Sequence, residues 1–343
     1  MADGAGWRTA VVPVLVGAAA ALAAVTVLLR ASAWPSALAV RWVFERGARR
    51  TSAVLAPLVP DGVTARLGEV VDGAPGIPAA HVDVVHPTAL ADGERLPTVV
   101  WVHGGAWVSG STRDVVEYAR ILAARGFTVV TVGYAVAPAH RYPVPVHQVS
   151  AALRHVVTHA ERYHVDPARL AVAGDSAGAQ IAAQVAALVT DPSYARRVGV
   201  EPPLPPDGLR GAVLLCGAYD VARIGGSGLR GWFLRTVLWS YSGTRDFATD
   251  PVVALASVRD HVTARFPPAF VSAGNADPLL PHSRDLVDRL REHGVPVDAL
   301  FFADDHEPAL GHEYQFRLDT AAGREALERV VAFLGTHLAS RAV

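Results

Sequence analysis

The chain has 343 residues, a formal net charge of −1 and 51% hydrophobic residues, enough for a sizeable buried core in one large domain or two ordinary ones. The near-zero charge argues against a nucleic-acid partner, which would require a basic surface. The single cysteine, Cys216, excludes an intramolecular disulfide and a cysteine zinc cluster. All 31 basic residues are arginine, and a chain without lysine cannot be a Schiff-base enzyme, a Walker-A nucleotidase or a Ser–Lys hydrolase.

The N-terminus holds an uncharged run of 21 residues, Thr9–Leu29. Since a helix crosses a bilayer with about 20 apolar residues, we expect residues 1–30 to be a membrane anchor, with the lipid bilayer as a partner. The alternative is a cleaved signal peptide, because Ala31-Ser32-Ala33 fits the A-x-A cleavage pattern, and the protein would then be secreted without residues 1–33. Positive charge on the C-terminal flank of the run predicts that the body of the protein is cytoplasmic. The arginines on that flank are Arg30, Arg41, Arg46, Arg49 and Arg50.

Strand-like and helix-like stretches alternate after the N-terminus, with no internal repeat and no low-complexity linker. Short apolar runs predict strands at Thr98–Val102, Phe127–Val132, Leu170–Ala173, Ala212–Leu215, Ala269–Ser272 and Asp298–Phe302. Helical spacing predicts helices at Val115–Ala124, Val149–Tyr163, Ala177–Val189, Ser283–His293 and Arg324–Leu334. This alternation predicts an α/β fold with a mostly parallel central sheet and helices on both faces.

Two stretches interrupt the alternation. We interpret residues 31–80 as a linker and the N-terminal part of a cap, and residues 81–343 as the α/β domain. Residues of about 221–260 lie between two predicted strands and are rich in aromatic side chains, so we expect a helical cap inserted over a site. The alternative is an ordinary buried helix pair. The aromatic side chains are Trp232, Phe233, Trp239 and Tyr241.

The segment Gly174-Asp175-Ser176-Ala177-Gly178 matches G-x-S-x-G and joins a predicted strand to a predicted helix. On such a tight turn the serine hydroxyl projects above the sheet, and the next backbone N–H points toward a developing oxyanion. The motif alone is common by chance. In this context it predicts that Ser176 is a nucleophile and that Ala177 contributes an N–H group to an oxyanion hole.

A glycine-rich turn, His103-Gly104-Gly105-Ala106-Trp107, follows the predicted strand Thr98–Val102. Glycines at the C-terminal end of a strand let backbone N–H groups face a small anion without obstruction from side chains. The N–H groups of Gly104, Gly105 and Ala106 are therefore further candidates for the oxyanion hole. The alternatives are a plain tight turn and a phosphate-binding loop, but the latter lacks the G-x-G-x-x-G spacing and the lysine.

In combination these motifs resemble the α/β-hydrolase fold, and within it the hormone-sensitive-lipase-like family of carboxylesterases. The resemblance covers about residues 96–338. Besides the two motifs, it rests on Tyr134 with Ala137-Pro138, on Asp166-Pro167, on Ala273–Leu280 (AGNADPLL) and on Gly311–Phe316 (GHEYQF). The chain departs from the family pattern with HGGA for HGGG, YAVAPA for the Y-R-L-A-P-E-like segment and GDSAGA for GDSAGG. None of these changes removes a side chain that does the chemistry, but the methyl group of Ala106 is expected to disfavour esters of bulky tertiary alcohols.

A serine nucleophile needs a histidine as a base, and the base needs a carboxylate that orients it. In this fold both residues follow the serine in the chain, first the acid and then the histidine. Asp277 resembles the catalytic acid of the family, and its alternative role is a helix cap or turn. His306 and His312 both follow the last predicted strand. We predict His312 as the base, because GHEYQF resembles the His-Gly-Phe segment of the family. His306 stands among acidic residues and fits an exposed turn.

The resemblance implies a serine carboxylesterase that hydrolyses short-to-medium acyl esters through an acyl-enzyme, with Ser176, Asp277 and His312 as a catalytic triad. It also implies that the N–H groups of Gly105, Ala106 and Ala177 contribute most to the oxyanion hole. The expected partner is a small-molecule ester, and no metal or organic cofactor is expected. A lipase, an amide deacetylase or a peptidase would keep this mechanism. A non-catalytic ligand-binding receptor on the same scaffold is a more distant alternative, since a receptor does not need serine, acid and histidine together.

Overall fold

The computed structural model describes residues 14–17, 23 and 26–340. Within these residues, eight strands form one sheet in the order β1-β2-β4-β3-β5-β6-β7-β8. β2 pairs antiparallel with both β1 and β4, and the remaining neighbours all pair in parallel. The strands are β1 (Val63–Val71), β2 (Ala80–Pro87), β3 (Leu96–Val102), β4 (Thr128–Gly133), β5 (Val165–Asp175), β6 (Gly211–Leu215), β7 (Ala269–Ala273) and β8 (Val297–Phe301).

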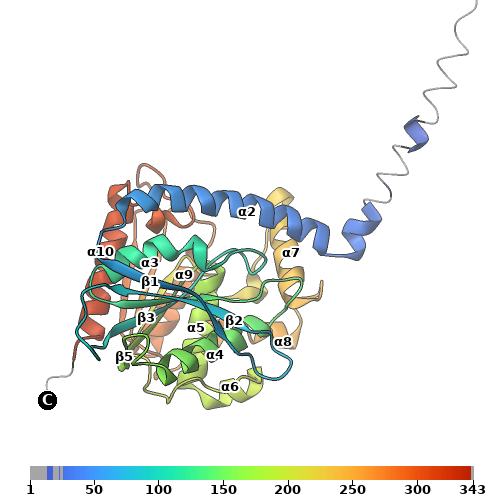
Figure 1. The fold of residues 1–343 in the computed structure, drawn as a ribbon. Coiled ribbons are helices and arrows are strands. Elements are labelled where there is room, and N and C mark those ends of the chain that lie inside the picture. Colours follow the sequence, from blue (N-terminus) through green and yellow to red (C-terminus); the bar gives the residue numbers. More distant parts are fainter. Residues whose placement is uncertain (1–13, 18–22, 24–25, 341–343) are drawn as a thin grey trace, which may run out of the picture.

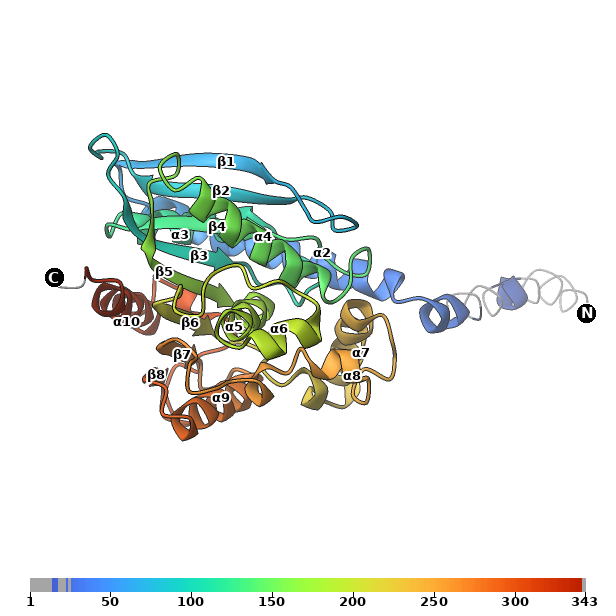
Figure 2. The same ribbon diagram turned by 90° about the horizontal axis from the view of Figure 1, so that it is seen from below.

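Helices cover both faces of this sheet (Figures 1 and 2). The helices are α2 (Trp34–Leu55), α3 (Val116–Ala123), α4 (Val144–Thr158), α5 (Ala177–Thr190), α6 (Pro192–Val198), α7 (Gly228–Ser242), α8 (Pro251–Ala254), α9 (Leu280–Glu292) and α10 (Ala321–His337). Successive side chains of a strand point to opposite faces. Accordingly, Val172 of β5 belongs to the core that includes α4, α5 and α9, whereas Ala173 belongs to the core that includes α3 and α10. The predicted α/β fold with a mostly parallel sheet is confirmed.

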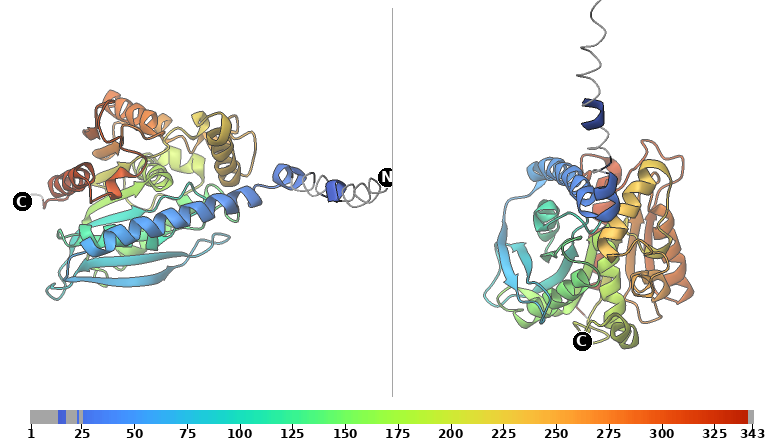
Figure 3. Two further views of the ribbon diagram at one scale, coloured as in Figure 1. Left: turned by 90° about the horizontal axis from the view of Figure 1, so that it is seen from above. Right: turned by 90° about the vertical axis from the view of Figure 1, so that its right-hand side faces the viewer.

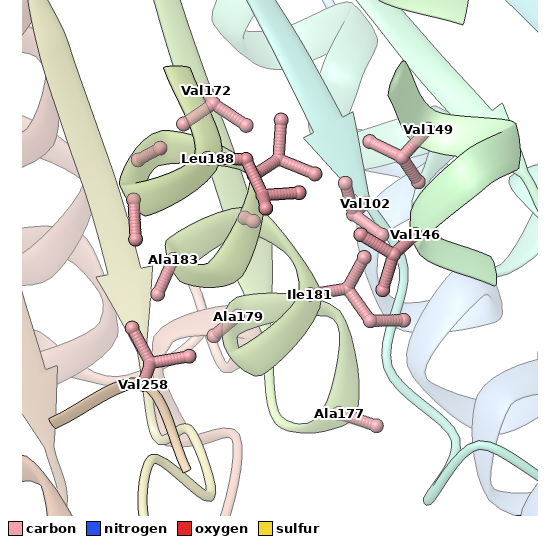
Figure 4. Close-up of a cluster of buried hydrophobic side chains, with 14 of the residues drawn as sticks. Val102, Val146, Val149, Val172, Ala177, Ala179, Ile181, Ala183, Leu188 and Val258 are labelled. Atoms are coloured by element: carbon pink, nitrogen blue, oxygen red, sulfur yellow. The ribbon is translucent and has the colours of Figure 1, made fainter. Parts of the chain in front are cut away.

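Helix α5 is buried along its whole length. Its sequence, AGAQIAAQVAALVT, consists largely of small and apolar residues, which allow close packing against the sheet. Figure 4 shows Ile181 and Leu188 of α5 packed among side chains of β3, β5 and α4, namely Val102, Val172, Val146 and Val149. This packing fixes the N-terminal end of α5, where Ser176 lies.

Each strand and helix predicted in the alternating part of the chain is present, with shifted ends. Four further elements, β1, β2, α2 and α6, are not predicted by the sequence pattern. The stretch of about 221–260 contains α7 and α8.

The prediction of a membrane-spanning helix at Thr9–Leu29 is wrong as far as the described part of the chain can test it. None of the described helices is long and apolar enough to cross a membrane. Most of the run lies outside the described residues, which omit 9–13, 18–22 and 24–25. The long helix that follows, α2, carries Arg41, Glu45, Arg46, Arg49 and Arg50 and cannot supply the apolar length. The anchor, the bilayer partner and the membrane-attached cytoplasmic localisation are therefore not retained.

Helix α2 runs across the top of the molecule in Figure 1 and lies beside α7, as the two views of Figure 3 also show. The aromatic rings of Phe44 in α2 and Phe233 in α7 are 5.7 Å apart. Arg41 of α2 donates hydrogen bonds to the carbonyl groups of Val108 at 2.7 Å and Ala137 at 3.0 Å. These bonds connect α2 to the loops after β3 and β4. The two stretches that interrupt the alternation thus contribute two helices that touch each other.

Candidate active site

Ser176 lies at the sharp turn between β5 and α5. Its backbone has φ 53° and ψ −121°, a conformation that residues with a side chain rarely adopt. The Ser176 N–H donates to the carbonyl of Leu215 in β6 at 2.8 Å, which holds the turn against the sheet. Gly178 allows the close approach of β3, because a Cβ at that position would collide with the carbonyl oxygens of Val102 and His103. The strand–turn–helix context expected around Ser176 is therefore present.

The structure brings the three predicted triad residues together. His312 Nε2 is 2.9 Å from Ser176 Oγ, and His312 Nδ1 is 2.9 Å from Asp277 Oδ2. The Asp277 side chain follows β7 and is fully buried, and its Oδ1 accepts the N–H of Leu279 at 2.7 Å. A carboxylate held in this way orients the imidazole with a proton on Nδ1 and leaves Nε2 to face the serine.

The loop between β8 and His312 decides which histidine reaches Ser176. Asn275 holds this loop: its Oδ1 accepts the Leu310 N–H at 2.8 Å, and its Nδ2 donates to the His306 carbonyl at 3.1 Å. The His306 ring lies 4.9 Å from that of Phe302, and its Nδ1 is 3.1 Å from the Pro308 carbonyl. The contacts of the His306 ring therefore stay within its own loop. Asn275 is a site residue that the sequence pattern does not single out, although it stands two positions before Asp277.

The surroundings of His312 favour its protonated form. Burial lowers the pKa of the imidazole, but the hydrogen bond to Asp277 and the negative charges of Glu313, Asp277 and Asp175 outweigh this and raise the pKa to about 9. The side chain keeps an exposed fraction of 32%. At neutral pH most of the imidazole is therefore protonated, and the form that can accept the serine proton increases toward alkaline pH.

The glycine-rich turn presents backbone N–H groups beside Ser176. Gly105 and Ala106 both have positive φ, 113° and 51°. Among the residues that the structure describes, the N–H groups of Gly105, Ala106 and Ala177 have no recorded acceptor. By contrast, the Gly104 N–H donates to Asp175 Oδ2 at 2.8 Å. Because its single proton is already engaged, the structure does not support Gly104 as an oxyanion-hole donor, and the N–H groups of Gly105, Ala106 and Ala177 stay candidates.

Buried polar contacts hold this turn in place. Asp175 accepts the Gly104 N–H and the Trp101 Nε1–H, both at 2.8 Å. Burial and the nearby charge of Glu313 raise the pKa of Asp175 well above its usual value. His103 stacks on Tyr134 with ring centroids 4.2 Å apart, and the Tyr134 hydroxyl donates to the His103 carbonyl at 3.1 Å. Burial lowers the pKa of His103 to about 4, so this histidine is neutral and structural.

A cavity of about 580 Å³ is lined by Ser176, His312 and the glycine-rich turn. Helices α2 and α7 contribute to its apolar lining with Val43, Phe44, Ala48, Phe233, Leu234 and Val237. Charged side chains also reach the cavity, and they are Asp114, Asp175, Arg223, Arg230 and Glu313. The site can therefore take an apolar group next to Ser176.

One group of three side chains in the described residues has donor atoms close enough to suggest a metal. The atoms belong to Cys216, Asp277 and His312 and lie within 4.8 Å of one another. The chemistry does not fit, because His312 Nδ1 and Asp277 are hydrogen-bonded to each other. Burial also raises the pKa of the Cys216 thiol well above its usual value, so the thiol keeps its proton. We therefore treat the contact between Asp277 and His312 as a hydrogen bond and not as part of a metal site.

Known proteins resemble the chain in sequence. The alpha/beta hydrolase fold family matches residues 99–306. Carboxylesterase NlhH from Mycobacterium tuberculosis is 41% identical over 128 residues, which cover 37% of this chain and only 39% of that protein. Esterase LipI from the same organism is 31% identical over 239 residues, which cover 67% of this chain and 71% of that protein.

The fold also resembles solved structures. A hyperthermophilic esterase from the archaeon Pyrobaculum calidifontis superimposes with a TM-score of 0.70 at 27% identity, over 88% of this chain and 92% of that one. The resemblance inferred from the sequence motifs is confirmed by these matches. The chain therefore belongs to the α/β-hydrolase fold family, and within it to the hormone-sensitive-lipase-like esterases.

Proposed function

We propose that this chain is a serine carboxylesterase that hydrolyses short-to-medium acyl esters, with Ser176, His312 and Asp277 as its catalytic triad. The observation that carries the proposal is the chain of two hydrogen bonds, each 2.9 Å long, from Asp277 through His312 to Ser176. The cavity beside Ser176 supports it by offering room for a substrate. The names of the relatives, esterase and carboxylesterase, support an ester-hydrolysing enzyme.

Acylation begins when Ser176 Oγ attacks the carbonyl carbon of the ester and its proton passes to His312 Nε2. Asp277 keeps the Nδ1 proton in place and stabilises the imidazolium that forms. The N–H groups of Gly105, Ala106 and Ala177 donate to the developing oxyanion, and such preorganised donors lower the barrier because they need no reorganisation. The tetrahedral intermediate then collapses, and the alcohol leaves with the proton from His312.

Deacylation repeats these steps with water as the nucleophile. His312 Nε2 accepts a proton from water as the water oxygen attacks the acyl group on Ser176. The same N–H groups stabilise the second oxyanion, the carboxylic acid leaves, and the proton returns to Ser176 Oγ. Atoms and charges balance without a cofactor.

We further propose that α2 and α7 act as a cap, with α2 from residues 31–80 and α7 from residues of about 221–260. Residues 81–343 form the catalytic domain together with β1 (Val63–Val71), because β1 pairs with β2 in the central sheet. The apolar side chains of both helices line the cavity, and the rings of Phe44 and Phe233 lie 5.7 Å apart. Each buried methylene group contributes about 0.8 kcal/mol. Binding should therefore strengthen with acyl length until the cavity is full, which agrees with short-to-medium chains.

An acyl-chain series tests this function directly. The full chain should release p-nitrophenol from p-nitrophenyl acetate, butyrate and octanoate, with an initial burst equivalent to the enzyme concentration where deacylation is slow. A preference for palmitate or for emulsified triacylglycerol would instead indicate a lipase, and a higher rate on the matching p-nitroanilides an amide hydrolase. No turnover of any of these substrates would contradict the proposal and favour a binding protein.

A further inference from the structure

Glu313 is a charged residue at the reacting atoms that the triad does not use. It follows His312 directly, and its backbone has φ 60°, a left-handed conformation that is uncommon for a residue with a side chain. Its Oε1 is 3.9 Å from His312 Nε2 and 3.0 Å from the position that a Cβ on Gly104 would occupy. The carboxylate therefore lies between the glycine-rich turn and the ring nitrogen that receives the serine proton.

The charge of Glu313 is not neutralised by an arginine in the part of the chain that the structure describes. Its one recorded ionic partner there is His312, and its side chain is 37% exposed, on the cavity. Of the arginines that line the cavity, Arg223 pairs with Asp220 at 3.4 Å, and Arg230 donates to the Pro278 carbonyl at 3.2 Å.

His312 itself faces groups from four elements. Asp277 comes from the loop after β7, Asp175 from the end of β5, the Cys216 thiol from the end of β6, and Glu313 from its own loop. The two aspartates are buried and held by backbone or side-chain donors. Glu313 is the one of these carboxylates that lies near Nε2 and is partly exposed.

We propose that Glu313 is a positioning residue for the base, whose carboxylate stabilises the imidazolium that His312 becomes when it accepts the serine proton. The inference rests on the proposed roles of Ser176 and His312. The same charge acts on the resting enzyme, because an anion near Nε2 also favours protonation before the substrate binds. Glu313 should therefore raise the rate at alkaline pH, where the resting imidazole is neutral. It should leave the rate at acid pH unchanged, because there the imidazole is protonated both at rest and in the transition state.

Glu313→Gln tests this, because it removes the charge and keeps the shape and the backbone demand of the side chain. The midpoint of the profile of kcat/KM against pH should move by at least ~0.7 pH unit toward acid, since a full charge about 4 Å away changes proton affinity about five-fold even at the dielectric constant of water. The alkaline plateau should fall by the same factor, so that the two profiles converge at acid pH. A merely structural role would lower the plateau without moving the midpoint.

Glu161→Gln, which removes an exposed carboxylate far along the chain, is the matched control and should keep the wild-type profile.

A second readout does not depend on turnover. The imidazole of His312 is titrated by NMR in Ser176→Ala, with and without Glu313→Gln, and the midpoint should move toward acid by the same amount. An unchanged midpoint in both experiments would overturn the proposal. A failure of the proposed function would give a different result. Ser176→Ala would then hydrolyse esters at the wild-type rate, while the NMR titration would still show the effect of Glu313 on the pKa of His312.

Discussion

Raising the pH from 7 to 9 should increase kcat/KM for ester hydrolysis about fifty-fold. The pKa of His312 is raised to about 9, because the hydrogen bond to Asp277 and the charges of Glu313, Asp277 and Asp175 outweigh the effect of burial. With that pKa, the neutral imidazole that can accept the serine proton makes up ~1% of the enzyme at pH 7 and ~50% at pH 9. A histidine with the ordinary pKa of about 6.5 would already be ~75% neutral at pH 7 and would gain only ~1.3-fold.

The assay is the hydrolysis of p-nitrophenyl butyrate at constant ionic strength, with the rate of Ser176→Ala subtracted at each pH. The ratio kcat/KM is the appropriate quantity, since its pH dependence reports the free enzyme. A rise of less than about three-fold between pH 7 and 9 would refute the reasoning, because a ratio that small requires an imidazole that is already at least about one-third neutral at pH 7, instead of ~1%. It would mean that the hydrogen bond to Asp277 and the nearby carboxylates do not raise the pKa of His312 far above its ordinary value.

Two further predictions concern the base and the support of the glycine-rich turn. His312→Ala should abolish turnover, while His306→Ala should keep most of it, and steady-state rates that reverse this order would contradict the assigned base. Trp101→Phe removes a donor from the buried carboxylate of Asp175 and should lower the free energy of unfolding in urea by about 1–3 kcal/mol or more. Trp107→Phe, which removes a 3.0 Å hydrogen bond to the neutral amide of Gln180, should cost about as much, because the raised pKa of Asp175 favours its neutral form; a much larger loss for Trp101→Phe would contradict this.

The serine turn could be predicted because its determinants are local. Five consecutive residues, a preceding apolar strand and a following helix specify the conformation of Ser176. The proximity of Asp277 and His312 to Ser176 could be predicted because chain order in the family restricts the choice of residues. The engagement of the Gly104 N–H could not, since its acceptor is a side chain 71 residues away whose position depends on the folded sheet.

The N-terminal strand β1 and helix α2 could not be predicted from the sequence for a different reason. β1 is an edge strand with a bulge between Arg66 and Glu69, and Gly68 in that bulge has φ 72°. A bulge interrupts the alternation of inward and outward side chains on which strand prediction depends. In α2 the apolar side chains are not confined to a buried stripe, since Leu38 and Trp42 are 50% and 59% exposed. Its pairing with α7 joins Phe44 to a residue far along the chain, and no local pattern encodes that contact.

The most direct test of the account is covalent labelling of the nucleophile. An alkyl phosphonate that mimics the tetrahedral intermediate is reacted with the full chain, with Ser176→Ala and with Ser193→Ala, a control that removes an exposed hydroxyl at the start of α6. We predict stoichiometric labelling of the peptide that contains Ser176 in the wild type and the control. Ser176→Ala should show no label, and its residual rate should be ~10³–10⁴-fold over the uncatalysed reaction. A Ser176→Ala enzyme that keeps more than a tenth of the wild-type kcat, or a label on another residue, would contradict the central claim.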